Sequence, residues 1–267
     1  MNLKQASELS HQQWRKMAAE LRKTAETRLF IGGEFVEAAD GGTFDNISPV
    51  DGSLINRCAA GKQADIDKAV AIARASFKSG EWSRMAPRER MAIMYRWAEL
   101  IAENGAELAL MDTIDMGKPI SDMVNDDIPM CIDTVQYFAE CIDKVTGTVT
   151  ATEYDVMSTV LREPIGVVGC ISPWNYPLLM ALWKIAPSLA AGNSTILKPA
   201  EQSPLSCYRV AELFLEAGGP AGALQVVNGI GEEAGQALAR HMDVSKISFT
   251  GSTEVGKLMH VLSLIHI

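Results

Sequence analysis

Two spacings of apolar residues alternate along this chain, and each spacing predicts a different kind of element. Before residue 146, apolar side chains recur every three or four positions, which is typical of helices with one buried face. We expect such helices after Asp65 as N-cap, after Pro87, and near residues 132–145. Gly80 ends the first of them, and a shorter stripe near the N-terminus consists of Trp14, Met17 and Leu21.

Segments that favour β-structure interrupt this helical pattern twice. Residues 29–31 and 35–36 flank Gly32 and Gly33, which predicts a tight hairpin because glycine readily adopts the positive φ angles of short turns. Residues 146–164 are rich in valine and threonine, with polar residues between them. They predict a β excursion with two exposed faces.

After residue 164, short apolar runs alternate with helical stretches. This alternation predicts an α/β fold with a doubly wound parallel sheet, because parallel strands need a crossover connection. Ligands of such sheets bind at the carboxyl ends of the strands, so the strand-to-helix turns are the places to look for chemistry. The expected strands are 165–171, 195–197, 224–227 and 247–249, and the expected helices are 177–191, 205–217 and 232–240.

Composition and charge narrow the classes of function. The net charge of -9 argues against a nucleic-acid partner, because phosphate binding needs an excess of Lys and Arg. No apolar run reaches the ~18 residues of a membrane span, and the N-terminus lacks the apolar core of a secretory signal. We therefore expect no membrane contact and a cytoplasmic location.

The cysteines and histidines predict no metal site. The five cysteines are an odd number without metal-type spacing, and the four histidines form no paired ligand set. In a chain of this length we expect reduced, mostly buried thiols. Cys170, within an expected strand, and Cys207, on the apolar side of an expected helix, are interpreted as core residues.

The first two strand-to-helix turns carry polar side chains with two interpretations each. Residues 172–177 present the Asn175 amide, which suits a developing oxyanion; alternatively, Asn175 is an ordinary turn residue. The next turn holds Lys198 and Glu201, which suit a phosphate and a ribose hydroxyl. Alternatively, they are a surface lysine and a helix-start glutamate.

The third and fourth turns are richer in glycine. Residues 229–235 resemble a dinucleotide fingerprint but hold one residue too many before the last glycine, and Glu232 and Glu233 would repel a pyrophosphate. A glycine-lined pocket edge is the better interpretation. Residues 249–256 lead from a strand into a helix, whose free N–H groups and Ser252 hydroxyl suit an anion. Alternatively, Ser252 is an ordinary N-cap.

Taken in order, these turns resemble the aldehyde dehydrogenase superfamily. The resemblance covers about residues 28–259, and within the superfamily the chain looks most like the bacterial γ-glutamyl-γ-aminobutyraldehyde dehydrogenases. The superfamily motifs are Pro173-Trp174-Asn175, Lys198-Pro199-Ala200-Glu201, the glycines from Gly229 to Gly235, Phe249-Thr250-Gly251-Ser252, the Gly32-Gly33 hairpin and Ser48-Pro49-Val50-Asp51-Gly52. The narrower resemblance rests on Asp126-Asp127-Ile128-Pro129 and Ile142-Asp143-Lys144-Val145.

The resemblance implies a division of the chain. Residues 1–145 would hold the N-terminal helices, the hairpin and the first part of the cofactor domain. Residues 146–164 would be the oligomerisation arm of a homodimer or homotetramer, and residues 165–261 the NAD-binding, Rossmann-like domain. Residues 262–267 do not resemble the family, and we expect them to be a non-native tail that follows a truncation.

The resemblance also implies the chemistry. It is the NAD(P)-dependent oxidation of an aldehyde, which we expect to be an aminoaldehyde, to a carboxylic acid through a cysteine thiohemiacetal and thioester. Asn175 would be the catalytic oxyanion donor. A carboxylate at the ribose, from Glu201, predicts NAD in preference to NADP. The residues implied at the cofactor are Ile171, Ser172, Pro173, Trp174, Lys198, Ala200, Glu201, Gly231, Gly235, Phe249, Gly251, Ser252, Thr253, Glu254, Val255 and Gly256. Lys198 would join Glu201 at the adenosine ribose, Ser252 would hold the pyrophosphate, and Gly231 would border the adenine.

The sequence also lacks the catalytic segments of the family. The family's general-base glutamate lies in a Leu-Glu-Leu-Gly-Gly segment and its nucleophile in a Gly-Gln-x-Cys segment, and neither is present. We therefore expect the C-terminal catalytic domain to be missing, and the chain alone to lack aldehyde oxidation and to bind NAD weakly at best. Two alternatives are an alcohol-dehydrogenase-type reductase, disfavoured because no regular glycine fingerprint follows the first strand of the sheet, and a non-catalytic nucleotide-binding or assembly module.

Overall fold

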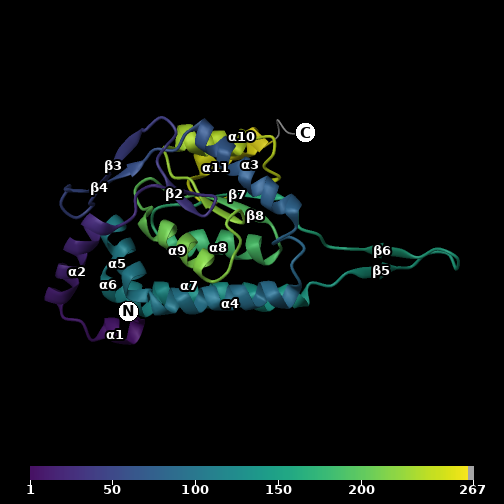
Figure 1. Cartoon of the computed structure of the whole chain (residues 1–267), viewed down its shortest axis with the longest axis horizontal. Helices are drawn as coiled ribbons and strands as arrows, with labels where there is room; N and C mark the ends of the chain where they lie inside the picture. The colour runs from purple at the N-terminus through teal and green to yellow at the C-terminus, as the bar shows by residue number, and fades with distance from the viewer. Residues whose placement is uncertain (264–267) are drawn as a thin grey trace.

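A six-stranded sheet with helices on both faces organises the protein (Figure 1). The computed structural model describes residues 1–263. The strand order is β10-β7-β8-β9-β1-β2, and the first four of these strands are parallel. Their bounds are β7 Val167–Ile171, β8 Ser194–Lys198, β9 Leu224–Val226 and β10 Lys246–Phe249. The predicted doubly wound parallel sheet is confirmed.

Two apolar cores lie against the sheet, one on each face. The alternation within β7 shows the division, because Val168 and Cys170 belong to one core while Val167 and Ile171 belong to the other. Helices α8 (Pro177–Ala190) and α9 (Leu205–Glu216) cover the first face, and α4 (Pro87–Glu103), α5 (Gly105–Met116) and α7 (Ile128–Cys141) pack outside them (Figure 1). The second face is covered by α3 (Gln63–Ser79), α10 (Gln236–Arg240) and α11 (Thr253–Ser263).

The segment before residue 60 extends the sheet and lines its edge. Strands β1 (Leu29–Ile31) and β2 (Glu34–Val36) form the predicted hairpin, with φ of 69° at Gly32 and 81° at Gly33. Strand β1 also pairs antiparallel with β9, so the hairpin is the far edge of the main sheet. The remaining elements are α1 (Leu3–Ser7), α2 (His11–Thr24) and the β3 (Thr43–Ile47) and β4 (Leu54–Ala59) pair.

The predicted β excursion is a two-stranded arm that projects from the body (Figure 1). Strands β5 (Thr148–Thr150) and β6 (Ser158–Val160) pair with each other alone. Apolar side chains on the arm are exposed, among them Val149, Met157 and Leu161. The arm therefore presents apolar surface that the body of this chain does not cover.

Three element boundaries differ from the predictions. Helix α3 begins at Gln63 with Lys62 as N-cap, and Asp65 sits one turn inside, where its carboxylate accepts from Lys62 N at 2.9 Å. The prediction that Asp65 is the N-cap was therefore wrong, although its carboxylate does accept from a backbone N–H at the start of the helix. Helix α7 spans 128–141 rather than 132–145, because Pro129 fits its first turn. The predicted helix 232–240 begins as a π-helical segment, η3 (Gly231–Gly235), and continues as α10. The short elements η1 (Met123–Asp127), α6 (Ile120–Asp122) and η2 (Ile142–Lys144) flank α7.

The cysteines are free thiols, as predicted. Four of the five are buried, and burial raises the pKa of Cys170 to about 12, which keeps it as an un-ionised core thiol. No helix among residues 1–263 is long and apolar enough to cross a membrane. The same residues contain no cluster of three or more metal-ligating side chains. The predicted tail, apart from its first two residues in α11, lies outside the described residues.

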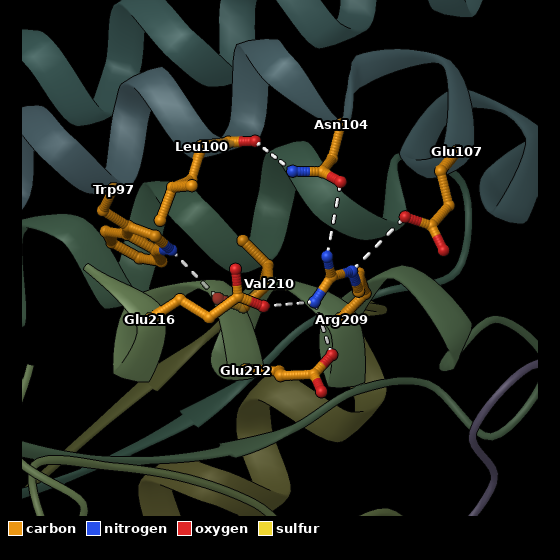
Figure 2. Close-up of polar contacts among 8 residues, drawn as sticks. All are labelled: Trp97, Leu100, Asn104, Glu107, Arg209, Val210, Glu212 and Glu216. Carbon is orange, nitrogen blue, oxygen red and sulfur yellow. Dashed lines mark hydrogen bonds and ion pairs between the residues drawn. The ribbon is translucent and has the colours of Figure 1, made fainter. Parts of the chain in front are cut away.

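Arg209 joins α9 to α5 through a network of polar contacts (Figure 2). Its guanidinium lies 3.3 Å from Glu107, 2.5 Å from Glu212 and 2.7 Å from Glu216, and it donates to Asn104 Oδ1 at 3.3 Å. The Arg209 side chain is only 19% exposed. Because three carboxylates share one cation, its removal would leave them to repel one another.

We expect Arg209→Ala to lower the free energy of unfolding by about 2 kcal/mol, since a shielded ion network loses its only cation. Urea denaturation followed by circular dichroism measures this loss. The matched control is Arg96→Ala, whose guanidinium contacts Glu99 and Glu103 on the exposed face of α4. That change should cost much less, because exposed ion pairs contribute little to stability. Equal losses in the two variants would contradict the network's role.

Candidate functional site

The carboxyl ends of β7, β8 and β10 meet at the switch point of the sheet. Strand β7 follows α7 and the arm in the chain but lies between β8 and β10 in the sheet, so the turns after these strands become neighbours. Thr250 N donates to Ile171 O at 3.1 Å, and Ser172 N donates to Lys198 O at 3.2 Å. The first, second and fourth predicted turns are thus hydrogen-bonded side by side.

The first turn presents Asn175 and Trp174 to solvent, beside buried Ser172. An ordinary turn asparagine hydrogen-bonds to the backbone of its own turn. Within the described residues, the Asn175 amide makes no such bond. Trp174 is 57% exposed, and its carbonyl accepts from Ser203 Oγ at 3.4 Å. This contact fastens the first turn to the second.

The second turn holds an ion pair between Lys198 and Glu201. Lys198 Nζ lies 2.8 Å from Glu201 Oε2, and the lysine is 3% exposed, so the alternative of a surface lysine was wrong. Ala200 between them is also buried, whereas Glu201 is partly exposed. The Lys198 ammonium group is therefore buried, whereas the Glu201 carboxylate is partly accessible to solvent.

The third turn is partly accessible at Gly231 and buried at Gly235. A Cβ atom added at either glycine would meet nothing within 4 Å outside the backbone of its own helix. Glu232 and Glu233 are exposed, and Glu233 lies 3.9 Å from Lys62 Nζ. These features agree with a glycine-lined edge and not with a phosphate loop.

In the fourth turn, Ser252 is the N-cap of α11. Its Oγ accepts from Val255 N at 3.2 Å, which leaves the hydroxyl hydrogen available to a ligand. The Phe249 ring covers Gly251, where a Cβ atom would lie 2.5 Å from the ring. Thr253, Glu254 and Val255 are exposed and Gly256 is half-buried, so this helix start is accessible from solvent. Both interpretations of Ser252 therefore remain compatible with its geometry.

A pocket of about 630 Å³, lined by both charged and apolar residues, adjoins the first turn through Tyr176. Lys118 Nζ lies 2.7 Å from both carboxylate oxygens of Asp127 and 4.1 Å from the centroid of the Tyr176 ring. Asp127 is thereby neutralised, while Asp122 and Asp126 add negative charge to the wall. The remaining lining residues are Met130, Leu179, Met180 and Trp183.

Sequence reasoning missed three buried polar residues beneath these turns. Lys184 Nζ donates to Thr250 Oγ1 at 2.6 Å, which ties α8 to the fourth turn. Asp112 accepts from Leu178 N at 3.2 Å, and Asp115 accepts from Leu205 N at 2.9 Å. The sequence did hold a signal for them. They are polar residues at positions where the periodic pattern of a helix predicts buried, apolar side chains.

Comparison with known proteins identifies the class. The family model for the aldehyde dehydrogenase family matches residues 35–263. The chain belongs to this family, and the predicted resemblance is confirmed.

Individual relatives agree with that assignment. The chain is 48% identical to the NADP/NAD-dependent aldehyde dehydrogenase PuuC of Escherichia coli (strain K12), over 91% of this chain and 49% of the relative. Two solved structures are also similar. The indole-3-acetaldehyde dehydrogenase of P. syringae in complex with NAD+ and IAA has a TM-score of 0.94 and 49% identity, covering 96% of this chain and 52% of that one. The γ-glutamyl-γ-aminobutyraldehyde dehydrogenase of Burkholderia cenocepacia J2315 has a TM-score of 0.92 and 46% identity, covering 99% and 52%. The chain thus spans about half the length of these relatives.

The buried carboxyl of Asp112 predicts an unusual dependence of stability on pH. Burial raises the pKa of Asp112 to about 7, from an ordinary value of 3.8, and burial also raises the pKa of Asp115. Between pH 3.8 and about 7, the Asp112 carboxyl keeps its proton in the folded protein and has lost it in the unfolded chain. The free energy of unfolding should therefore fall as pH rises from about 4 to about 7, by up to ~1.4 kcal/mol per pH unit for each group.

Urea denaturation of the chain at pH 5, 6, 7 and 8 measures this slope. Asp112→Asn should make the slope shallower, because the amide cannot ionise and Asp115 alone still contributes. Asp155→Asn, in the exposed turn of the arm, is the control and should leave the slope unchanged. A wild-type stability that rises over this range would contradict the prediction.

Proposed function

We propose that this chain forms the cofactor-binding half of an NAD-dependent aldehyde dehydrogenase that oxidises an aldehyde to a carboxylic acid. The observation that carries the proposal is the meeting of three turns at one end of the sheet. The Asn175 amide, which has no hydrogen-bond partner among residues 1–263, lies there with the Lys198–Glu201 pair and the start of α11. An extended ligand with a ribose, a diphosphate and a reacting end suits this arrangement.

The residues present fit a nicotinamide dinucleotide. Glu201 would accept from ribose hydroxyls, while the Ser252 hydroxyl and the N–H groups that open α11 would donate to the diphosphate. The free space beside Gly231 would take the adenine. The dinucleotide, when bound, supplies the acceptor for the hydride that leaves the aldehyde carbon.

Asn175 would act on the substrate. Its side-chain N–H groups are free to donate to the aldehyde oxygen as that oxygen gains negative charge. The cavity beyond Tyr176 would receive the remainder of the aldehyde. Asp122 and Asp126 on its wall would favour a cationic amino group, so we propose an aminoaldehyde as the substrate class. The apolar arm would pair subunits into a homodimer or homotetramer.

We expect Glu201→Gln to narrow the preference for NAD over NADP, because the carboxylate would repel a 2′-phosphate and the amide would not. Ligand-observed NMR titrations of the chain with each dinucleotide can measure the ratio of dissociation constants. Gln202→Glu, at the exposed neighbouring position, provides a charge control that should not narrow it. An unchanged ratio in Glu201→Gln would count against the ribose assignment.

The catalytic role can be tested by joining this chain to the remaining part of the Escherichia coli relative. The chimera should oxidise aldehydes with NAD, whereas the chain alone should not exceed a no-enzyme blank. Asn175→Ala in the chimera should lower kcat about 100-fold, on the order of 3 kcal/mol of barrier, because the oxyanion loses a donor.

Asn125→Ala, an exposed amide distant in sequence, serves as the control and should retain activity. An aminoaldehyde should also be a better substrate than an uncharged aldehyde of equal length. A folded chimera that binds NAD but never turns over would favour the alternative of a non-catalytic module.

A further inference from the structure

Two helices begin directly after the proposed cofactor turns, and neither caps its own N-terminus. Helix α8 follows the first turn, and α9 follows the second. Tyr176 and Pro204 at their N-cap positions provide no side-chain hydrogen bond, and neither helix has an acidic residue in its first turn. Leu178 and Leu205 are buried, so their backbone N–H groups need acceptors from elsewhere in the fold.

Helix α5 supplies both acceptors. Asp112 Oδ2 accepts from Leu178 N at 3.2 Å, and Asp115 Oδ2 accepts from Leu205 N at 2.9 Å. The two aspartates are three positions apart, so they project from neighbouring turns of one face of α5. Both are nearly inaccessible to solvent, at 1% and 2% exposure. A single rigid helix therefore caps the two crossover helices of the sheet.

These caps lie close in sequence to the residues that would touch the ligand. Leu178 comes three residues after Asn175, and Leu205 comes four residues after Glu201. Ser203 Oγ also donates to Trp174 O, which links the two turns to each other. A shift at either helix start would therefore move both the oxyanion donor and the ribose-binding pair.

We propose that Asp112 and Asp115 are positioning residues of the cofactor site, which fix the first and second turns by capping α8 and α9 from α5. This inference rests on the proposed function, since the turns matter to binding only if the dinucleotide lies there. Each carboxyl group also has a second polar neighbour. Asp115 Oδ1 accepts from Asn46 Nδ2 at 2.8 Å. The Ser206 hydroxyl lies beside the Asp112 carboxyl.

An asparagine tests the caps themselves. Its amide oxygen can still accept from the helix N–H, and its NH2 group can pair with the second neighbour, because a serine hydroxyl also accepts and Asn46 Oδ1 has no hydrogen-bond partner among the described residues. Asp112→Asn and Asp115→Asn should therefore keep the caps, whereas Asp112→Ala and Asp115→Ala should each release a turn. If the negative charge mattered instead of the caps, the asparagine variants would lose binding as the alanine variants do.

The experiment measures AMP and NAD binding to the full chain by ligand-observed NMR, with amide hydrogen exchange as a second reading. Asp115→Ala should weaken AMP binding at least fivefold and speed exchange in residues 198–205, whereas Asp115→Asn should do neither. Asp112→Ala should speed exchange in residues 173–178, and Asp112→Asn should not. The matched control is Thr113→Val, a near-isosteric change on α5 at a hydroxyl that has no hydrogen-bond partner among the described residues; it should alter neither reading.

The outcomes separate this inference from the proposed function. An AMP affinity in Asp115→Ala that equals the wild-type affinity, in a chain that binds AMP, overturns the positioning role and leaves the cofactor site intact. No AMP or NAD binding by the wild type counts against the proposed site, while exchange still tests the caps. If Asp115→Ala does not fold, wild-type exchange decides, since rapid exchange of the Leu178 and Leu205 amides overturns the inference.

Discussion

The parallel pairing of β10 with β7 is the contact on which the site depends. It places the last of the parallel strands beside the first of them, although about 75 residues separate the two in sequence. It thereby brings the start of α11 next to the turn that carries Asn175. Without this pairing the fourth turn would lie apart from the first and second turns, which the β7–β8 pairing joins. The helices on both faces bury the paired strands, and one apolar core lies on each face of the sheet.

Much of this arrangement could be predicted from the sequence, because it depends on local patterns. Strand and helix alternation after residue 164 gave the sheet, and paired glycines gave the β1–β2 hairpin. The position of Asn175 at a strand exit also followed from the order of elements. The family resemblance came from motifs in order, since no single turn distinguished a ligand site from an ordinary cap or turn. The roles of the individual residues remain proposals.

Other features could not be predicted because they depend on contacts between distant segments. Asp65 is an N-terminal helix residue rather than an N-cap, since its carboxylate reaches back to Lys62 and also to Ala39 N. The burial of Lys198 follows from its place in a central strand covered on both faces. The caps made by Asp112 and Asp115 join segments 66 and 90 residues apart, and no local pattern encodes such a pairing.

The arm has a consequence of its own. Strands β5 and β6 are paired only with each other, so each retains an outer row of backbone N–H and C=O groups turned to water. An isolated two-stranded ribbon is marginally stable. If another chain supplies the missing strand pairing, mass action makes the ordering of this ribbon depend on how concentrated the protein is. Dilution would then loosen the arm while the body of the molecule, with its own two cores, keeps its shape.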